Sequence, residues 1–282
     1  MRVVLDTDIG TDIDDTWALA MAARSPELDI SLITTVSGDP MYRARVARGL
    51  LGPGIPIAAG LGGGRDVHPG TPQRTLAAEA DGPIDDDGVA ALVAACAEPT
   101  TVIALGPLTN LAAALDRDPS IASRTRVVAM LGSVRVGYHG HVEPVPEYNV
   151  KVDVEAVRTV FAAPWSVTIT PVDTCGTILL RGDAYQRVLA TPDPMVQRLL
   201  ASYREWLGDS VELFDRRSTT LFDCVAIHLA HDESLVEIEE LPLAIDDDGM
   251  MRINAGSPVV RVATRWRDEA AFVEHLVQRL TA

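Results

Sequence analysis

Short apolar runs alternate with longer segments rich in alanine and leucine up to about residue 170. Several runs are almost continuous in apolar residues, which is typical of strands buried on both faces. They predict strands at residues 3–5, 30–36, 55–59, 101–105, 126–131 and 166–170. The segments between them predict helices at residues 14–24, 42–51, 88–97, 108–115 and 154–161. This alternation predicts an α/β fold with an open, mostly parallel sheet and helices on both faces.

Beyond residue 180 the pattern becomes helical, with helices predicted at residues 184–190, 195–207 and 221–230. Short strands at 235–238, 243–245 and 259–263 and a last helix at 269–281 complete the expected elements. No Pro/Gly/Ser-rich linker, repeat or low-complexity tract breaks the chain, so residues 1–282 are expected to form a single domain. Ligands of open α/β sheets bind beyond the carboxyl ends of strands, so the loops at 60–82, 132–146 and 208–219 are candidate ligand sites.

The charge balance restricts the partners of this chain. Its 282 residues are 47% hydrophobic, which is ample for a packed core. It has 24 basic and 40 acidic residues, a formal net charge of −16, and Lys151 is its sole lysine. Such a chain repels phosphate backbones and anionic membranes, so neither a nucleic acid nor a membrane is an expected partner.

Cysteine usage and the N-terminus indicate a cellular compartment. Cys96, Cys175 and Cys224 are scattered and lack Cys-x-x-Cys spacing, so they predict neither a disulfide framework nor a zinc cluster. The first residues lack the long apolar stretch and cleavage site of a signal peptide. No run of about 18 apolar residues predicts a transmembrane helix. We therefore expect a cytoplasmic protein.

The densest group of chemically active side chains follows the first predicted strand, in the segment Leu-Asp-Thr-Asp-Ile-Gly-Thr-Asp-Ile-Asp-Asp at residues 5–15. Its carboxylates are Asp6, Asp8, Asp12, Asp14 and Asp15. Crowded carboxylates repel one another unless a cation compensates them, and an all-oxygen site suits Ca²⁺ or Mg²⁺. The structural alternatives are a solvated charge run and a helix cap at Asp14 or Asp15.

Two families with acidic loops match this segment only in part. An EF-hand loop counted from Asp6 requires glycine where Thr11 stands and glutamate where Trp17 stands. Haloacid-dehalogenase-type phosphatases share the Asp-x-Asp pattern of residues 6–8, but Gly10 replaces their usual Thr or Val. A magnesium-dependent phosphatase remains the alternative enzyme, with the acidic run at residues 246–248 as its late acidic group.

The segment most resembles the metal-binding N-terminal motif of nucleoside hydrolases, Asp-x-Asp-x-Gly…Asp-Asp, with two additional residues before Asp14. Four later segments resemble further motifs of that family. They are Gly-Pro-Leu-Thr-Asn at 106–110, Pro-Glu-Tyr-Asn at 146–149, Leu-Phe-Asp-Cys at 221–224 and Thr-Thr-Val-Ser-Gly-Asp at 34–39. Each segment also has a structural interpretation as a turn or a helix cap. Their order across residues 6–223 extends the resemblance over most of the chain.

The resemblance implies a Rossmann-like fold and calcium-dependent hydrolysis of the N-glycosidic bond of ribonucleosides, which releases ribose and free base. In that family a carboxylate activates a water held by the metal, and this base would be Asp8. The implied Ca²⁺ ligands are Asp8, Asp15, Asp223 and the backbone carbonyl of Leu105. The implied substrate-binding residues are Asp14, Asp39, Glu147, Asn149 and Phe222. The role of Asp12, which lies in the lengthened loop, stays open.

The leaving base is where this chain departs from the family. Many purine-active members protonate the base from a histidine at the position of Phe222, which cannot donate a proton. The open alternatives are a donor among Tyr138, His139, His141 and His68, a base that leaves without help, and stacking by Phe222 itself. We therefore expect no ordinary inosine activity.

The family also implies a small-molecule ribonucleoside as the partner in nucleoside catabolism, and a homodimer or homotetramer. A non-enzymatic alternative is a ribose- or metal-binding module that has lost turnover. Phe222 and Asp39, which replaces the usual asparagine, are the features that support this alternative.

Overall fold

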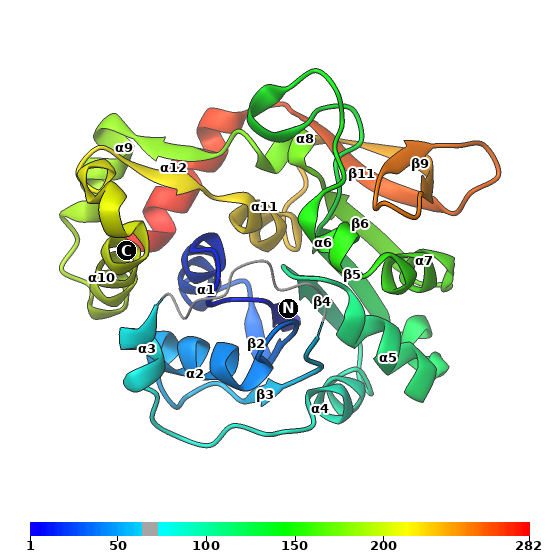
Figure 1. The fold of residues 1–282 in the computed structure, drawn as a ribbon, viewed down its shortest axis with the longest axis horizontal. Helices are drawn as coiled ribbons and strands as arrows, with labels where there is room; N and C mark the ends of the chain where they lie inside the picture. The colour runs from blue at the N-terminus through cyan, green and yellow to red at the C-terminus, as the bar shows by residue number, and fades with distance from the viewer. Residues whose placement is uncertain (64–72) are drawn as a thin grey trace.

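The computed structural model describes residues 1–63 and 73–282, and its described part contains a nine-stranded sheet (Figure 1). The sheet order is β10-β9-β11-β6-β5-β4-β1-β2-β3. The parallel strands are β1 (Arg2–Thr7), β2 (Asp29–Thr35), β3 (Ile57–Ala59), β4 (Thr100–Ala104), β5 (Thr125–Met130) and β6 (Ser166–Thr170). Strand β11 (Val259–Trp266) continues this parallel set, whereas β9 (Val236–Ile245) and β10 (Met251–Ile253) are antiparallel at one edge.

Helices cover both faces of the sheet because its strands are apolar on both sides. Val3 and Leu5 point into one hydrophobic core and Val4 points into the other, as strand alternation requires. The first core includes residues of α1 (Asp14–Ala23), α2 (Pro40–Leu51), α10 (Pro194–Leu207), α11 (Phe222–Leu229) and α12 (Glu269–Thr281). The second core includes residues of α4 (Gly88–Ala95), α5 (Thr109–Arg117) and α7 (Val154–Ala162).

Shorter elements complete the described structure. The short helices are α3 (Arg74–Ala78), α6 (Tyr148–Val152), α8 (Val172–Cys175) and α9 (Gly182–Leu189), with 3-10 turns at Pro119–Ser123, Tyr138–Gly140 and Gly208–Leu213. Strands β7 (Leu179–Arg181) and β8 (Arg217–Thr220) form a separate antiparallel pair. Among the described residues, the helices are too short or too polar to cross a membrane.

The predicted α/β class with a mostly parallel sheet is confirmed, and several element boundaries are corrected. The two strands predicted at 235–238 and 243–245 form one strand, β9. Pro242 lies within this strand, just outside its pairing with β10, where a missing N–H is tolerated. Strands β7, β8 and β10 and helices α3, α6 and α8 were not predicted, because they are too short to show a period.

The parallel topology places several chain segments at one edge of the sheet. Strands β1, β4 and β5 end there, and each continues into a loop before the next helix. Helix α11 packs against α1, so the N-terminus of α11 reaches the same edge (Figure 1). Residues from distant parts of the sequence therefore meet beyond the carboxyl ends of the strands.

Candidate active site

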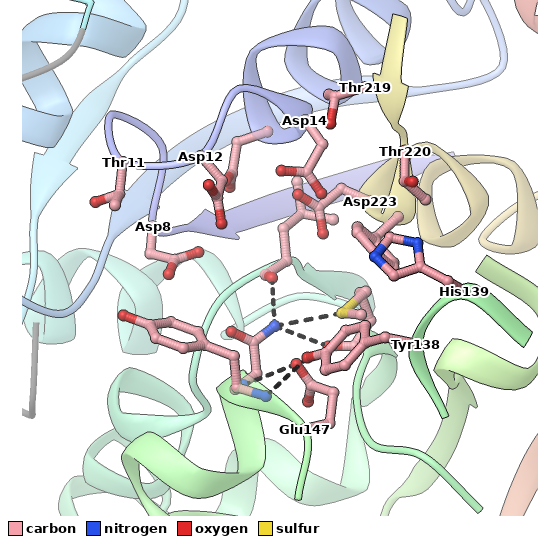
Figure 2. Close-up of a pocket in the computed structure, with 16 residues that line it drawn as sticks. Asp8, Thr11, Asp12, Asp14, Tyr138, His139, Glu147, Thr219, Thr220 and Asp223 are labelled. Carbon is pink, nitrogen blue, oxygen red and sulfur yellow. Dashed lines mark hydrogen bonds between the residues drawn. The ribbon is translucent and has the colours of Figure 1, made fainter. Parts of the chain in front are cut away.

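A cavity of about 310 Å³ lies at this edge of the sheet (Figure 2). This volume is at the lower end of the range for small-molecule sites. It is lined by Asp8, Thr11, Asp12, Asp14, Asp15, Leu105, Met130, Tyr138, His139, Glu147, Tyr148, Asn149, Thr219, Thr220, Phe222 and Asp223. The site residues implied by the resemblance are thus brought together, with the exception of Asp39.

Three buried carboxylates from two helix N-termini meet in the cavity. Asp14 and Asp15 occupy the first turn of α1, and Asp223 occupies the first turn of α11. One carboxylate oxygen from each lies within 4.8 Å of the others, an arrangement that could hold a metal ion. Burial and the neighbouring carboxylates raise the pKa of all three well above the usual aspartate range. A cation with a preference for oxygen ligands fits this donor set, because it would offset the repulsion.

Asp8 lies beside these carboxylates and close to the turn after β4. Its negative charge contributes to the raised pKa of Asp15 and Asp223. A Cβ atom at Gly106 would lie 2.9 Å from Asp8 Oδ1 and 3.0 Å from the Asp8 backbone nitrogen. Glycine therefore allows the turn at residues 106–110 to pack directly against Asp8.

The lengthened acidic loop is held by its backbone carbonyls. Arg43 of α2 donates to the carbonyl of Asp8 and, at 3.1 Å, to that of Ile9. Trp206 of α10 donates from Nε1 to the Thr11 carbonyl at 2.9 Å, and Gln73 donates to the Asp12 carbonyl, also at 2.9 Å. These bonds fix the path of the backbone, so the carboxylate side chains need not hold it.

Asp6, the first aspartate of the motif, is fully buried and accepts hydrogen bonds at the point where the acidic loop leaves β1. Its Oδ1 accepts hydrogen bonds from Thr34 Oγ1 at 2.5 Å and from Asn110 Nδ2 at 2.8 Å. Burial raises the pKa of Asp6 to about 7. Asp6 thus ties β1 to β2 and to the start of α5, beneath the cavity rather than in its lining.

The segment at residues 147–149 forms another wall of the cavity. Asn149 Nδ2 donates to the Leu105 carbonyl at 2.7 Å and to the Met130 carbonyl at 3.1 Å. Glu147 caps α6 by accepting from the backbone nitrogen of Asn149 at 2.9 Å, and it also accepts from that of Gly132 at 2.9 Å. Burial raises the pKa of Glu147 to about 7. Its carboxylate therefore has the helix-capping role that was the structural alternative for this segment.

Aromatic and imidazole groups form another part of the cavity lining. The rings of Tyr138 and Phe222 meet edge to face, with centroids 5.8 Å apart. Burial raises the pKa of Tyr138, so its hydroxyl keeps its proton. Figure 2 shows Tyr138 and His139 across the cavity from Asp8. His141 is exposed and is not part of the described lining, and His68 lies outside the described residues.

Asp39 occupies a different position from the other expected site residues. It is exposed, and its side chain caps α2 by accepting from the backbone nitrogen of Tyr42 at 3.0 Å. It is absent from the described lining of the cavity. The acidic residues 246–248, which the phosphatase alternative required, lie in the turn between β9 and β10 and are likewise absent from that lining.

Several lining residues were not identified from the sequence. They are Thr11, Met130, Tyr148, Thr219 and Thr220. Tyr148 lies inside the motif at 146–149, so its position was a usable signal. Thr219 and Thr220 belong to β8, a strand too short to be predicted. Thr219 ends the candidate loop at 208–219, whereas no sequence pattern indicated Thr220.

The site and fold agree with a known protein family. A sequence model of the inosine-uridine preferring nucleoside hydrolase family matches residues 3–274. The chain belongs to this family. Membership makes this nucleoside hydrolase an N-glycosyl hydrolase, which is the enzyme class that the sequence predicted, and it does not favour the phosphatase alternative. The family is metal-dependent, in agreement with the acidic group in the cavity.

Relatives of known name cover most of the chain. The inosine-uridine preferring nucleoside hydrolase of Leishmania major is 28% identical, over 89% of this chain and 85% of its own length. Uridine nucleosidase 1 of Arabidopsis thaliana is 26% identical, over 92% of this chain and 85% of its own length. The structure of a purine-preferring ribonucleoside hydrolase from Gardnerella vaginalis shares the fold, with a TM-score of 0.80 at 21% identity, over 100% of this chain and 98% of that one. These names differ in the base they specify, so membership leaves the base preference open.

Proposed function

We propose that this nucleoside hydrolase cleaves the N-glycosidic bond of ribonucleosides with Ca²⁺ in the acidic cavity and releases ribose and free base. The observation that carries the proposal is the convergence of Asp14, Asp15 and Asp223 within 4.8 Å, in a cavity that Asp8 also lines. A buried group of carboxylates is costly unless a cation or protons offset its charge. The oxygen-only donor set favours a hard ion such as Ca²⁺.

The residues that would hold the ion are Asp8, Asp15, Asp223 and the backbone carbonyl of Leu105. All four line the cavity. The Leu105 carbonyl already accepts a hydrogen bond from Asn149, and a carbonyl oxygen has a second lone pair for a cation. When bound, Ca²⁺ supplies positive charge that offsets the carboxylates and orients the ribose diol.

The chain's own residues would then carry the reaction at the sugar. Asp8 acts as the general base that removes a proton from the attacking water. Asp14 and Asn149 bind the ribose hydroxyls, with Glu147 behind Asn149 as the cap of α6. Positive charge develops on the sugar in the transition state, and the fixed carboxylates of the cavity stabilise it.

The base would leave between the aromatic groups and His139. Phe222 offers an aromatic ring for stacking but no proton, and its ring meets that of Tyr138 edge to face. Among the described residues of the lining, His139 is the sole histidine. His139 is therefore our candidate proton donor for bases that need one.

A reducing-sugar assay over a nucleoside panel tests the proposed function. The panel contains inosine, adenosine, guanosine, uridine, cytidine, nicotinamide riboside and a 2′-deoxynucleoside, with calcium or with a chelator. We expect calcium-dependent ribose release and little cleavage of the 2′-deoxynucleoside. Without the 2′-hydroxyl group, the polar groups of the cavity that would bind it are left unpaired. Phosphate release from phosphomonoesters in magnesium without ribose release would contradict the proposal, as would ribose binding without turnover.

The same panel tests the role of position 222. Because Phe222 cannot protonate a base, we expect nicotinamide riboside, whose base is already cationic, to be cleaved faster than inosine. Cleavage of inosine at least as fast as of every other nucleoside would contradict this expectation.

A further inference from the structure

A second group of potential metal ligands lies at the opposite end of α11 from Asp223. His228 belongs to the last turn of α11, His231 follows that helix, and His275 belongs to α12. One ring nitrogen from each lies within 4.8 Å of the others. The ring centroid of His228 is 4.7 Å from that of His275 and 5.1 Å from that of His231. None of these residues is part of the described lining of the acidic cavity.

The imidazole groups of this cluster have unused nitrogen atoms. His228 is 3% exposed, and neither of its ring nitrogens has a hydrogen-bond partner among the described residues. The Nε2 atom of His231 is also buried without a partner in the described structure. Buried polar atoms are nearly always satisfied in proteins, so several unpartnered nitrogens within one imidazole cluster indicate a missing partner.

The buried position of the cluster also bears on its protonation. Burial lowers the pKa of His228 to about 4 and lowers the pKa of His231 and His275. Burial therefore favours the neutral form of these imidazoles, which is the form that ligates metals. The last turn of α11 adds a partial negative charge from its carbonyls, which favours a cation.

The charged neighbours do not oppose a cation at this position. Arg279 donates weakly to His275 Nε2 at 3.4 Å, but it forms an ion pair with Glu27, which offsets its charge. Asp232 Oδ2 lies 3.9 Å from His228 Nε2 and is a further carboxylate beside the cluster. The N-terminal amino group of Met1 bonds to the Glu27 carbonyl. Two carboxylates thus balance two cationic groups around three neutral imidazoles.

We propose that His228, His231 and His275 form a binding site for a divalent transition-metal ion of the Zn²⁺ type, with Asp232 or water in the fourth position. Imidazole nitrogen suits Zn²⁺, whereas the all-oxygen cavity suits Ca²⁺, so the two sites differ in the ion they select. The ion would join the C-terminal end of α11 to α12. Since Asp223 is at the start of α11, this site fixes the helix that carries an acidic-cavity carboxylate.

Cobalt titration of the full-length protein tests this proposal. The chain is stripped of metal, supplied with excess Ca²⁺ to occupy the acidic cavity, and titrated with Co²⁺ while visible absorption is recorded. We expect one equivalent to give the intense bands of a four-coordinate, nitrogen-rich site, and Zn²⁺ to displace it. His231→Gln and His275→Gln should each weaken Co²⁺ binding more than about 100-fold, because even outer-shell changes cost 10- to 100-fold.

Two control variants separate the cluster from other binding. His141→Gln changes an exposed histidine outside the cluster, and Asp15→Asn changes a carboxylate of the acidic cavity; both should keep the Co²⁺ bands. His231 and His275 are partly exposed, so the glutamine variants should fold, which circular dichroism checks. Absence of the bands in the wild type, or bands that persist in both glutamine variants, would overturn the proposal.

Discussion

Gly106 determines how closely the turn after β4 approaches Asp8. A Cβ at this position would lie 2.9 Å from Asp8 Oδ1, so Gly106→Ala must displace the carboxylate or the turn. We expect kcat for ribose release to fall about 100-fold, as for a displacement of about 1 Å in an active site. Gly54→Ala is the control, because its Cβ would meet open space. Equal activity of the two variants would show that the position of Asp8 is unimportant.

The His139→Gln variant tests whether His139 protonates the leaving base. If it protonates the base, His139→Gln should lower kcat for adenosine by about 100-fold or more, the usual contribution of general acid catalysis. Nicotinamide riboside needs no proton, so its kcat should change little in the same variant. The ratio of the two kcat values is the measurement. Equal losses on both substrates would assign His139 to binding rather than to proton transfer.

At the residue scale, the sequence indicated which acidic residues lie together, while their catalytic and metal-binding roles stay predictions. Asp14 and Asp15 line the cavity, as their crowding after a buried strand suggested, and Asp223 lines it, as the family resemblance implied. Asp39 shows where prediction from the residue type fails. An aspartate before a proline can be a ligand or a helix cap, and its hydrogen bond to Tyr42 shows that it caps α2.

The acidic loop depends on elements that are distant in sequence. Trp206 of α10 donates to the Thr11 carbonyl at 2.9 Å, and Trp266 of β11 donates to the Thr174 carbonyl at the same distance. Trp206→Phe and Trp266→Phe should each lower the free energy of unfolding by about 1 kcal/mol. Trp206→Phe alone should raise the Kd for calcium, measured by titration. Similar calcium affinity in both variants would contradict a role for α10 in holding the loop.

At the element scale, long segments with a clear period were predictable and short ones were not. The central parallel strands and their helices agree with the apolar pattern, because each buries one or two continuous faces. Strand β8 carries Thr219 and Thr220 into the cavity, yet it has four residues and, among the described strands, pairs with β7 alone. Its existence depends on tertiary contacts that no local pattern contains.

For the whole molecule, the raised pKa values of Asp14, Asp15 and Asp223 couple stability to pH. Each carboxyl binds its proton more tightly when folded, so the metal-free protein loses unfolding free energy as the pH rises above about 4 and through the raised pKa values. Bound calcium would offset the negative charge of these carboxylates. We therefore expect calcium to raise Tm more near pH 8 than near pH 5.

Calorimetry with and without calcium at the two pH values measures this coupling. At a calcium concentration 100-fold above Kd, the stabilisation should be about 2.7 kcal/mol. Asp15→Asn should reduce the effect at high pH. A Tm increase that is the same at both pH values would mean that calcium does not compete with protons for these carboxylates.

The central claim is that Asp8 activates the water that attacks the ribose. The most direct measurement is kcat for ribose release by Asp8→Asn under saturating nucleoside and calcium, with Asp86→Asn as an exposed control of the same chemical change. We predict a loss of about 100- to 10,000-fold for Asp8→Asn and none for Asp86→Asn. A kcat of Asp8→Asn within a few-fold of wild type would contradict the account.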